Sequence, residues 1–394
     1  MPKLDPLLRE LIERGGSDLH LCSERVPMLR IDGDMEMSSW DALSPTEVDA
    51  LLRELMDERA LHEYDTLHDA DFAYEIEGLA RFRVNIFQDR YGMGGVFRQI
   101  PSKVLTADEL NLPKSIRDLC WLSKGLVLVT GPTGSGKSTT LAAMVDLINK
   151  SRSDHIITIE DPVEFVHYDQ CCLVNQREVK NNTKSFASAL RAALRQDPDI
   201  VLVGELRDLE TIEIAMETAE TGHLVFGTLH TNTAASTVDR IIDSFPANRQ
   251  NQIRSMLSNS LKAAISQTLC KKIGGGRVAA LEVLMVDHGV AAMIRDGKIH
   301  QIPSAMQVGG NKGMKLLNQA LGELVKSGKV SPEEGYIKAI DKDAFLKVLE
   351  RLECPMPDFS KKEVAAEEAS AGDDEDYEGV ETGKPKKRGF FGQG

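Results

Sequence analysis

Hydrophobic and polar residues alternate in short segments over the first hundred residues of the chain. The clearest segment is 81–87, where the apolar side chains take one face of a predicted strand and Arg81 and Arg83 take the other. Leucines spaced three and four residues apart predict a helix over 4–12, and the sequence Ser-Pro-Thr-Glu at 44–47 predicts the start of a second helix. Together these elements indicate a small α+β domain.

The pattern changes near residue 114 to nearly continuous apolar segments that alternate with helical ones. Continuous apolar segments of strand length are typical of parallel strands that are covered on both faces. We expect strands at 126–130, 156–160, 200–205 and 224–229, and helices at 138–149, 185–196 and 208–220. This alternation predicts an α/β core with a mostly parallel sheet and crossover helices. The rest of the core is predicted to be mostly helical, over 249–269, 313–326 and 331–340.

The patterning divides the chain into four parts: an α+β domain over 1–100, a linker over 101–113, an α/β core with a helical C-terminal part over 114–357, and a tail over 358–394. In the tail, residues 363–381 hold nine acidic side chains and no basic ones, and a basic segment with two phenylalanines follows. Because such a composition cannot bury a core, we expect the tail to be disordered.

Composition narrows the class of protein. The 394 residues are enough for a large core, and the formal net charge of −14 disfavours broad binding to a phosphate backbone, so we expect no nucleic-acid partner. No apolar stretch approaches the roughly 18 residues of a membrane-spanning helix, and acidic residues interrupt the N-terminal apolar pattern, which argues against a signal peptide. The six cysteines form no C-x-x-C pair, which argues against a zinc ribbon or a disulfide framework. We expect a cytoplasmic protein.

A phosphate-binding loop follows the first strand of the core. It reads Gly131-Pro132-Thr133-Gly134-Ser135-Gly136-Lys137-Ser138-Thr139 and fits the pattern G-x-x-x-x-G-K-[ST]. The loop follows an apolar strand and opens an amphipathic helix, a setting in which curled backbone N–H groups surround phosphate oxygens. We expect Lys137 to neutralise charge on the β- and γ-phosphates and the Ser138 hydroxyl to bind Mg²⁺. The expected ligand is therefore ATP with Mg²⁺.

Hydrolysis also needs a carboxylate that orients the attacking water, and usually a second one near the metal. Glu160 and Glu205 each end a predicted strand of the core, and carboxylates at the carboxyl ends of such strands point into the ligand crevice. Gly204 stands where a Walker B motif has its aspartate. We therefore expect Glu205 to contact Mg²⁺ through water.

Two histidines, His223 and His230, flank the predicted strand at 224–229. Because both bracket one strand of the sheet, we expect them to sense phosphate, with His223 in nucleotide binding and His230 in catalysis. The glycine-rich segment 274–277 precedes a strand rather than a helix, so it is predicted to be a hairpin turn.

Taken in order, these residues resemble the PilT-type twitching-motility ATPases, the retraction motors of type IV pili within the type II/IV secretion ATPase superfamily. The resemblance covers about residues 1–350. It rests on five segments, namely 15–21, the phosphate loop, the acidic segment around Glu160, the segment 197–205, which reads as that family's Walker B with a glycine at 204, and the histidine segment 219–231.

The resemblance implies a PAS-like N-terminal domain joined to a RecA-like core, assembled as a homohexameric ring with nucleotide between the two domains. Arginines of the N-terminal domain would complete the catalytic site; Arg83 and Arg98 match best, and Arg81 is a further candidate. The implied partners are the platform protein of the pilus in the inner membrane and a paralogous pilus ATPase. The implied location is the cytoplasmic face of that membrane.

Alternative functions stay open at this point. A pilus-extension or type II secretion assembly ATPase of the same superfamily usually carries paired C-x-x-C zinc ligands, which this sequence lacks. An accessory or paralogous retraction ATPase is a further alternative, because the segment 289–296 keeps only part of the charged pattern of the retraction branch. A nucleotide-gated scaffold without hydrolysis would not need Glu160 and Glu205.

Overall fold

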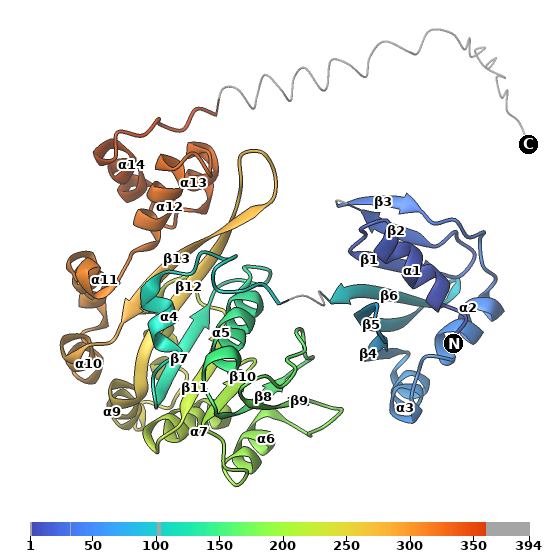
Figure 1. Ribbon diagram of the computed structural model, residues 1–394, viewed down its shortest axis with the longest axis horizontal. Coiled ribbons are helices and arrows are strands. Elements are labelled where there is room, and N and C mark those ends of the chain that lie inside the picture. Colours follow the sequence, from blue (N-terminus) through green and yellow to red (C-terminus); the bar gives the residue numbers. More distant parts are fainter. Residues whose placement is uncertain (1, 32, 101–103, 360–394) are drawn as a thin grey trace, which may run out of the picture.

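The computed structural model describes residues 2–31, 33–100 and 104–359. In these ranges the chain forms two separate β-sheets, each packed against helices of its own (Figure 1). The mixed α/β class predicted from the sequence is confirmed, whereas the PAS-like character of the N-terminal part stays a prediction. Within the same ranges, no helix combines the length and the apolar character needed to cross a membrane. From residue 360 on, the predicted tail lies outside the described residues.

The N-terminal sheet has six strands in the order β3-β2-β1-β6-β5-β4, and every neighbouring pair is antiparallel. Its strands are β1 (Asp18–Cys22), β2 (Met28–Ile31), β3 (Asp34–Met37), β4 (Asp69–Ile76), β5 (Ala80–Asp89) and β6 (Gly92–Ile100). The helices that share its apolar core are α1 (Asp5–Glu13), α2 (Pro45–Arg53) and α3 (Glu58–Leu67).

Local sequence signals account for these elements. In β5, Phe82, Val84 and Ile86 are fully buried, and the two arginines predicted to face away from them do so. α2 begins after Ser44, whose hydroxyl accepts from the backbone N–H of Glu47 while the Glu47 carboxylate accepts from the Ser44 N–H at 2.8 Å. This reciprocal cap satisfies two N–H groups that a helix start otherwise leaves unpaired.

The core sheet has seven strands in the order β13-β12-β7-β11-β10-β8-β9. These are β7 (Gly125–Thr130), β8 (His155–Glu160), β9 (Leu173–Glu178), β10 (Ile200–Val203), β11 (Leu224–Leu229), β12 (Leu261–Lys271) and β13 (Arg277–Met285). All neighbours are parallel except β12 and β13, which form an antiparallel hairpin. The hairpin turn predicted at 274–277 is thereby confirmed.

Helices cover both faces of the core sheet. These helices are α4 (Lys114–Leu119), α5 (Lys137–Ser151), α6 (Phe186–Ala193), α7 (Leu209–Glu220), α8 (Ala234–Asp243) and α9 (Gln250–Ser260). Along β7, Leu126 and Leu128 belong to one apolar cluster, with α6, α7 and α9, while Val127 and Val129 belong to another, with α4 and α5. The C-terminal helical part comprises α10 (His288–Arg295), η1 (Ile299–Gln301), α11 (Ile302–Val308), η2 (Gly309–Lys312), α12 (Leu317–Lys326), α13 (Pro332–Lys338) and α14 (Lys342–Arg351).

The helix predicted over 249–269 is wrong in its second half, because α9 ends at Ser260 and β12 starts at the next residue. Apolar residues at 253, 257, 261 and 265 keep a helical spacing through the boundary. β12 lies between β7 and β13, however, and four of its first five residues are buried. A strand covered on both faces is apolar at consecutive positions, so periodicity alone does not separate it from a buried helix.

Candidate active site

The phosphate loop, both predicted carboxylates and His230 lie at one edge of the core sheet. β7, β11, β10 and β8 are neighbours and run parallel, so their carboxyl ends meet there. The loop follows β7, Glu160 ends β8, Glu205 follows β10 and His230 follows β11. In open α/β sheets, ligands bind outside the carboxyl ends of the strands. The structure therefore brings four separate sequence segments into one candidate site.

Glycines give the phosphate loop its curl. Gly131, Gly134 and Gly136 have φ values of 144°, 75° and 88°, a region that side chains rarely allow. Gly131 is also closely packed, because a Cβ there would collide with the backbone oxygen of Gln267. Lys137 follows at the start of α5, where its Nζ donates to the carbonyl oxygens of Gly131 at 2.9 Å and Pro132 at 3.1 Å. Burial lowers the pKa of this lysine.

The loop fits a phosphate group and an accompanying Mg²⁺. The Oγ atom of Ser135 is buried and has no hydrogen-bond partner within the described part of the chain, so a phosphate oxygen would supply one. Lys137 and Ser138 open α5, and a helix N-terminus favours anions. Mg²⁺ takes oxygen ligands and, beside phosphates, needs only one or two from the protein. The Ser138 hydroxyl and the Glu205 carboxylate match that requirement.

Glu160 is fixed by two polar side chains. Its Oε1 accepts from Thr158 Oγ1 at 2.7 Å and from Gln176 Nε2 at 3.2 Å. Burial raises the pKa of Glu160 to about 7, an effect that these two hydrogen bonds oppose and the charge of Glu164 supports. A carboxyl group with a pKa near neutrality is suited to accept a proton from water.

Gly204 explains why the Walker B position lacks an aspartate. A Cβ at Gly204 would stand 3.2 Å from the Cα atom of Glu160, which is tighter than ordinary van der Waals contact. The glycine therefore lets the end of β10 lie close against the end of β8.

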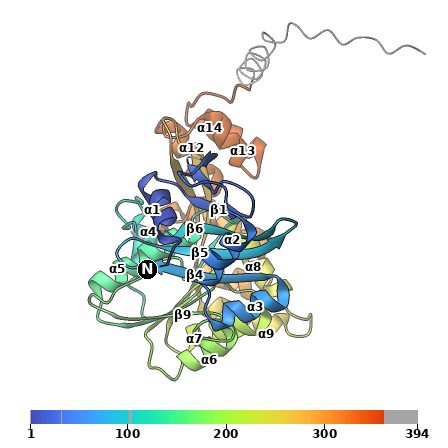
Figure 2. The same ribbon diagram turned by 90° about the vertical axis from the view of Figure 1, so that its right-hand side faces the viewer.

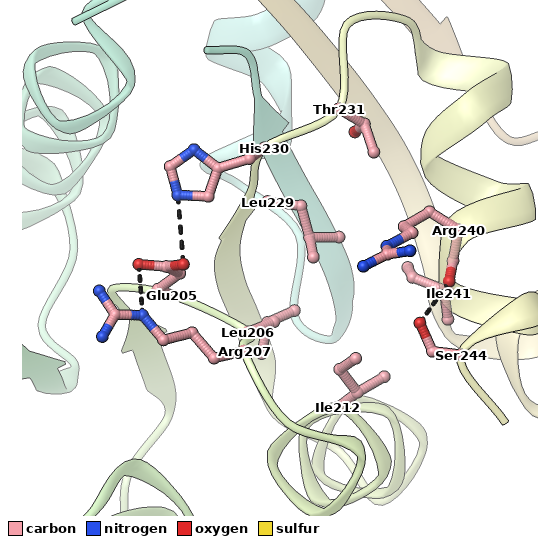
Figure 3. Close-up of a pocket in the computed structure, with 10 residues that line it drawn as sticks. All are labelled: Glu205, Leu206, Arg207, Ile212, Leu229, His230, Thr231, Arg240, Ile241 and Ser244. Carbon is pink, nitrogen blue, oxygen red and sulfur yellow. Dashed lines mark hydrogen bonds and ion pairs between the residues drawn. The ribbon is translucent and has the colours of Figure 1, made fainter. Parts of the chain in front are cut away.

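Glu205 takes part in a small charged cluster (Figure 3). Its Oε1 lies 3.1 Å from His230 Nε2, and its Oε2 lies 2.7 Å from Arg207 Nε. A second nitrogen of Arg207 lies 3.8 Å from the Asp161 carboxylate, which follows Glu160. The cluster lines a cavity of about 420 Å³, and Arg240 lines the same cavity from α8. Arg207 thus connects the two strand ends that carry the predicted acids.

Within this chain, His223 does not join the site. β11 runs parallel to β7 from the pair Leu224–Gly125 to the pair Leu229–Thr130, so His223 precedes β11 at the opposite edge of the sheet. At about 3.3 Å per residue, the length of β11 separates it from the phosphate loop by about 20 Å. His223 Nδ1 lies 3.1 Å from the Thr218 carbonyl oxygen, a local contact at the end of α7.

Of the three arginines predicted to complete the site, Arg81 provides the described contact with the core. Its Nη2 lies 2.9 Å from Glu178 Oε2 at the end of β9, and the side chains are 22% and 5% exposed. The same oxygen accepts from the Val163 N–H at 3.0 Å. Arg98 instead pairs with Asp18 of its own sheet at 2.7 Å, and Arg83 is exposed. Figure 2 shows the N-terminal sheet in front of the core.

Three polar residues of this region were missed in the sequence. Arg207 offered a weak signal, since it is a cation two residues after a strand-end glutamate. Gln176 lies on β9, a strand without a continuous apolar segment, and Gln267 lies in the part of β12 that was predicted as helix. Their contacts depend on the order of strands in the sheet, which is not a local property.

Comparisons with known proteins were made for both sequence and structure. The chain matches the family model described as type II/IV secretion system protein over residues 1–324. It is 52% identical over 333 residues to the type IV pilus retraction ATPase PilT of Pseudomonas aeruginosa, a match that covers 84% of this chain and 97% of that protein. It is 39% identical over 338 residues to the type IV pilus ATPase PilU of the same organism, covering 86% and 88%. Its structure is similar to the crystal structure of the pilus retraction motor PilT with bound ADP, with a TM-score of 0.83, 45% identity, and coverage of 89% and 99%.

Proposed function

Because the chain belongs to the type II/IV secretion system protein family, and within it to the PilT-like pilus retraction ATPases, we propose that it works as a homohexameric ring that powers retraction of type IV pili. The ring would act on the platform protein of the pilus at the cytoplasmic face of the inner membrane, with a paralogous pilus ATPase as a second partner. The observation that carries the proposal is a complete phosphate loop at the same edge of the core sheet as Glu160 and Glu205, which lie at the carboxyl ends of parallel strands.

In the proposed mechanism, the phosphate loop binds the nucleotide. The N–H groups of the loop and the Lys137 ammonium hold the β- and γ-phosphates, and Ser135 Oγ donates to one of their oxygens. The Ser138 hydroxyl, and Glu205 through water, would hold Mg²⁺. When bound, Mg²⁺ neutralises charge that develops on the phosphate oxygens.

Glu160 acts as the base in this proposal and accepts a proton from the attacking water. Thr158 and Gln176 keep its carboxylate in one orientation, through the hydrogen bonds of 2.7 Å and 3.2 Å. His230 contacts the γ-phosphate in this proposal and couples its presence to Glu205, because His230 Nε2 lies 3.1 Å from Glu205 Oε1. Arg207 holds the other oxygen of Glu205, so this carboxylate is oriented on both sides.

Arginines of the N-terminal sheet would complete the site when the two parts of the chain close on the nucleotide. We assign this role to Arg83 and Arg98, which lie side by side in the register of β5 and β6. A cation at the γ-phosphate is worth on the order of 10³–10⁵ in rate in related sites. Arg83→Ala and Arg98→Ala should each keep ATP binding and lose most turnover. Arg90→Ala, an exposed arginine at the end of the same hairpin, is the matched control.

Deletion of the gene tests the biological role. A retraction motor predicts cells that carry more pili and no longer twitch, and restoration by the wild-type gene but not by the Lys137→Ala variant. Cells without pili would identify a pilus-extension ATPase instead. Reduced but persistent twitching would identify an accessory retraction ATPase, the alternative favoured by the altered segment 289–296.

A further inference from the structure

Among the buried polar residues of the β12–β13 hairpin, Gln267 and Glu282 make side-chain hydrogen bonds to other elements. Gln267 of β12 is 3% exposed and Glu282 of β13 is 5% exposed. The hairpin starts beside β7 in the core sheet and extends toward the C-terminal helices (Figure 1). A buried polar group is costly unless it is satisfied, so the partners of these two residues identify what the hairpin holds in place.

Gln267 supports the phosphate loop. Its Nε2 donates to the Ser135 carbonyl oxygen at 2.8 Å, and its Oε1 accepts from Thr140 Oγ1 at 2.7 Å. The loop also packs directly on this residue, because a Cβ at Gly136 would stand 2.8 Å from Gln267 Nε2. A single amide therefore fixes the loop before Lys137 and the first turn of α5 after it.

Glu282 supports the starts of two helices. Its Oε1 accepts from the Ala234 N–H at 2.7 Å, and its Oε2 accepts from the Leu317 N–H at 3.0 Å. These are the first residues of α8 and α12, and the first N–H groups of a helix have no partner within the helix. α8 begins four residues after His230, so the carboxylate of Glu282 fixes the far end of the segment 230–233.

Further hydrogen bonds near Glu282 reinforce its contacts with the starts of α8 and α12. Thr231 of the same segment lies 2.7 Å from Thr237 in α8, measured between their hydroxyl oxygens. On the other side, Val283 and Lys315 exchange two backbone hydrogen bonds of 2.8 Å and 2.9 Å just before α12. β13 is thus attached to the catalytic edge through α8 and to the C-terminal helices through α12.

We propose that Gln267 and Glu282 are positioning residues that support two different functions of the ATP site. Gln267 positions the loop that binds nucleotide, whereas Glu282 positions the His230 segment that acts in hydrolysis and couples it to α12. The hydrogen bonds of both side chains go to protein groups. The inference rests on the proposed roles of the loop and of His230, and it predicts that displacement of α12 changes turnover without changing ADP affinity.

The test compares Gln267→Met with Glu282→Gln in the full chain, with Thr268→Val on the same strand as the control. Nucleotide affinity is measured by titration with fluorescent ADP, and kcat by phosphate release at saturating ATP. Gln267→Met loses the hydrogen bond to Ser135 of the loop and the one from Thr140 of α5, so the Kd for ADP should rise about tenfold while kcat stays within about threefold. Glu282→Gln turns an amide NH₂ toward a helix N–H, so kcat should fall about tenfold while the Kd stays within about threefold.

The inference is overturned if each variant changes Kd and kcat to the same extent and that change follows the fall in its melting temperature. Such a result would show that both residues only stabilise the fold. His230→Ala is measured beside them: if it leaves kcat unchanged, the proposed catalytic site is wrong, and if it alone lowers kcat, only the present inference is wrong. Amide hydrogen exchange of the unmodified protein needs no variant. Binding of a non-hydrolysable ATP analogue, which carries the γ-phosphate that His230 is proposed to sense, should slow exchange over 231–238 and 315–320 together, whereas ADP should not; protection of the first segment alone would refute the coupling.

Discussion

Replacement of Glu160 by glutamine would remove the ionisable carboxyl group while keeping the size and position of the side chain. The amide oxygen of glutamine can accept the same hydrogen bonds from Thr158 and Gln176, so the geometry of the site should survive. The variant cannot accept a proton from water at neutral pH. We therefore expect Glu160→Gln to bind ATP normally and to lose turnover, in keeping with the effect of a general base, about 10²–10⁴-fold.

The pH dependence of the wild-type enzyme gives an independent measure of the same group. With a pKa of about 7, roughly one-tenth of Glu160 is ionised at pH 6 and roughly nine-tenths at pH 8. Wild-type kcat should therefore rise about tenfold over this interval and then level off. The residual activity of Glu160→Gln should be flat across the interval, because the titrating group has been removed.

Stability should change in the opposite direction to activity. Glu160 has a higher pKa in the folded protein, about 7, than its ordinary value of 4.5, so the folded state binds the extra proton between these values. The free energy of unfolding then falls as pH rises from 4.5 to 7, by about 3 kcal/mol in total. Glu160→Gln should consequently raise the melting temperature at pH 8 and leave it nearly unchanged at pH 4.

The assay is phosphate release at saturating ATP from pH 6 to 8, with ADP titration and thermal unfolding on the same samples. Glu164→Gln serves as the control, because Glu164 is exposed and its charge raises the pKa of Glu160. That control should keep its turnover and shift the midpoint of the pH profile downward. Wild-type turnover by Glu160→Gln would refute the reasoning and leave Glu205 as the base.

Three further predictions concern the rest of the molecule. Lys137→Ala should lose ATP affinity and hydrolysis together, because the phosphate charge is no longer neutralised; normal binding of fluorescent nucleotide would contradict this. Arg81→Ala leaves the buried Glu178 carboxylate without its cation, so turnover should fall at unchanged ATP affinity, and small-angle scattering should show a larger radius of gyration. Truncation after Asp358 should preserve the proposed hexamer and its ATPase activity, as judged by light scattering and phosphate release.

The residues that follow strands could be predicted from the sequence, because they are local features. A parallel sheet brings the carboxyl ends of its strands together whatever their order, so Glu160, Glu205, His230 and the phosphate loop meet at one edge. The two histidines that flank β11 show the limit of this reasoning. Bracketing one strand places them at opposite edges of the sheet, so proximity in sequence is not proximity in the site.

Contacts between distant segments could not be predicted in the same way. Gln267 supports the phosphate loop only because β12 lies next to β7, and strand order is a property of the whole sheet. Arg81 and Arg83 lie on the same polar face of β5, so the alternation of polar and apolar residues does not distinguish which of them contacts the core. Which of the two contacts the core depends on the placement of the N-terminal sheet, which no local pattern encodes.

The ion pair between Arg81 and Glu178 also determines how the core would bear mechanical load. Glu178 is the last residue of β9, which is paired in parallel with β8 from His155–Leu173 to Glu160–Glu178. A pull on Arg81 along the strand would load all the hydrogen bonds of this pair at once, in shear, rather than opening them one after another. The N-terminal sheet therefore contacts the core at a strand end where the hydrogen bonds of β8 and β9 would resist tension together. This strand end lies next to Glu160, the carboxylate proposed to activate water.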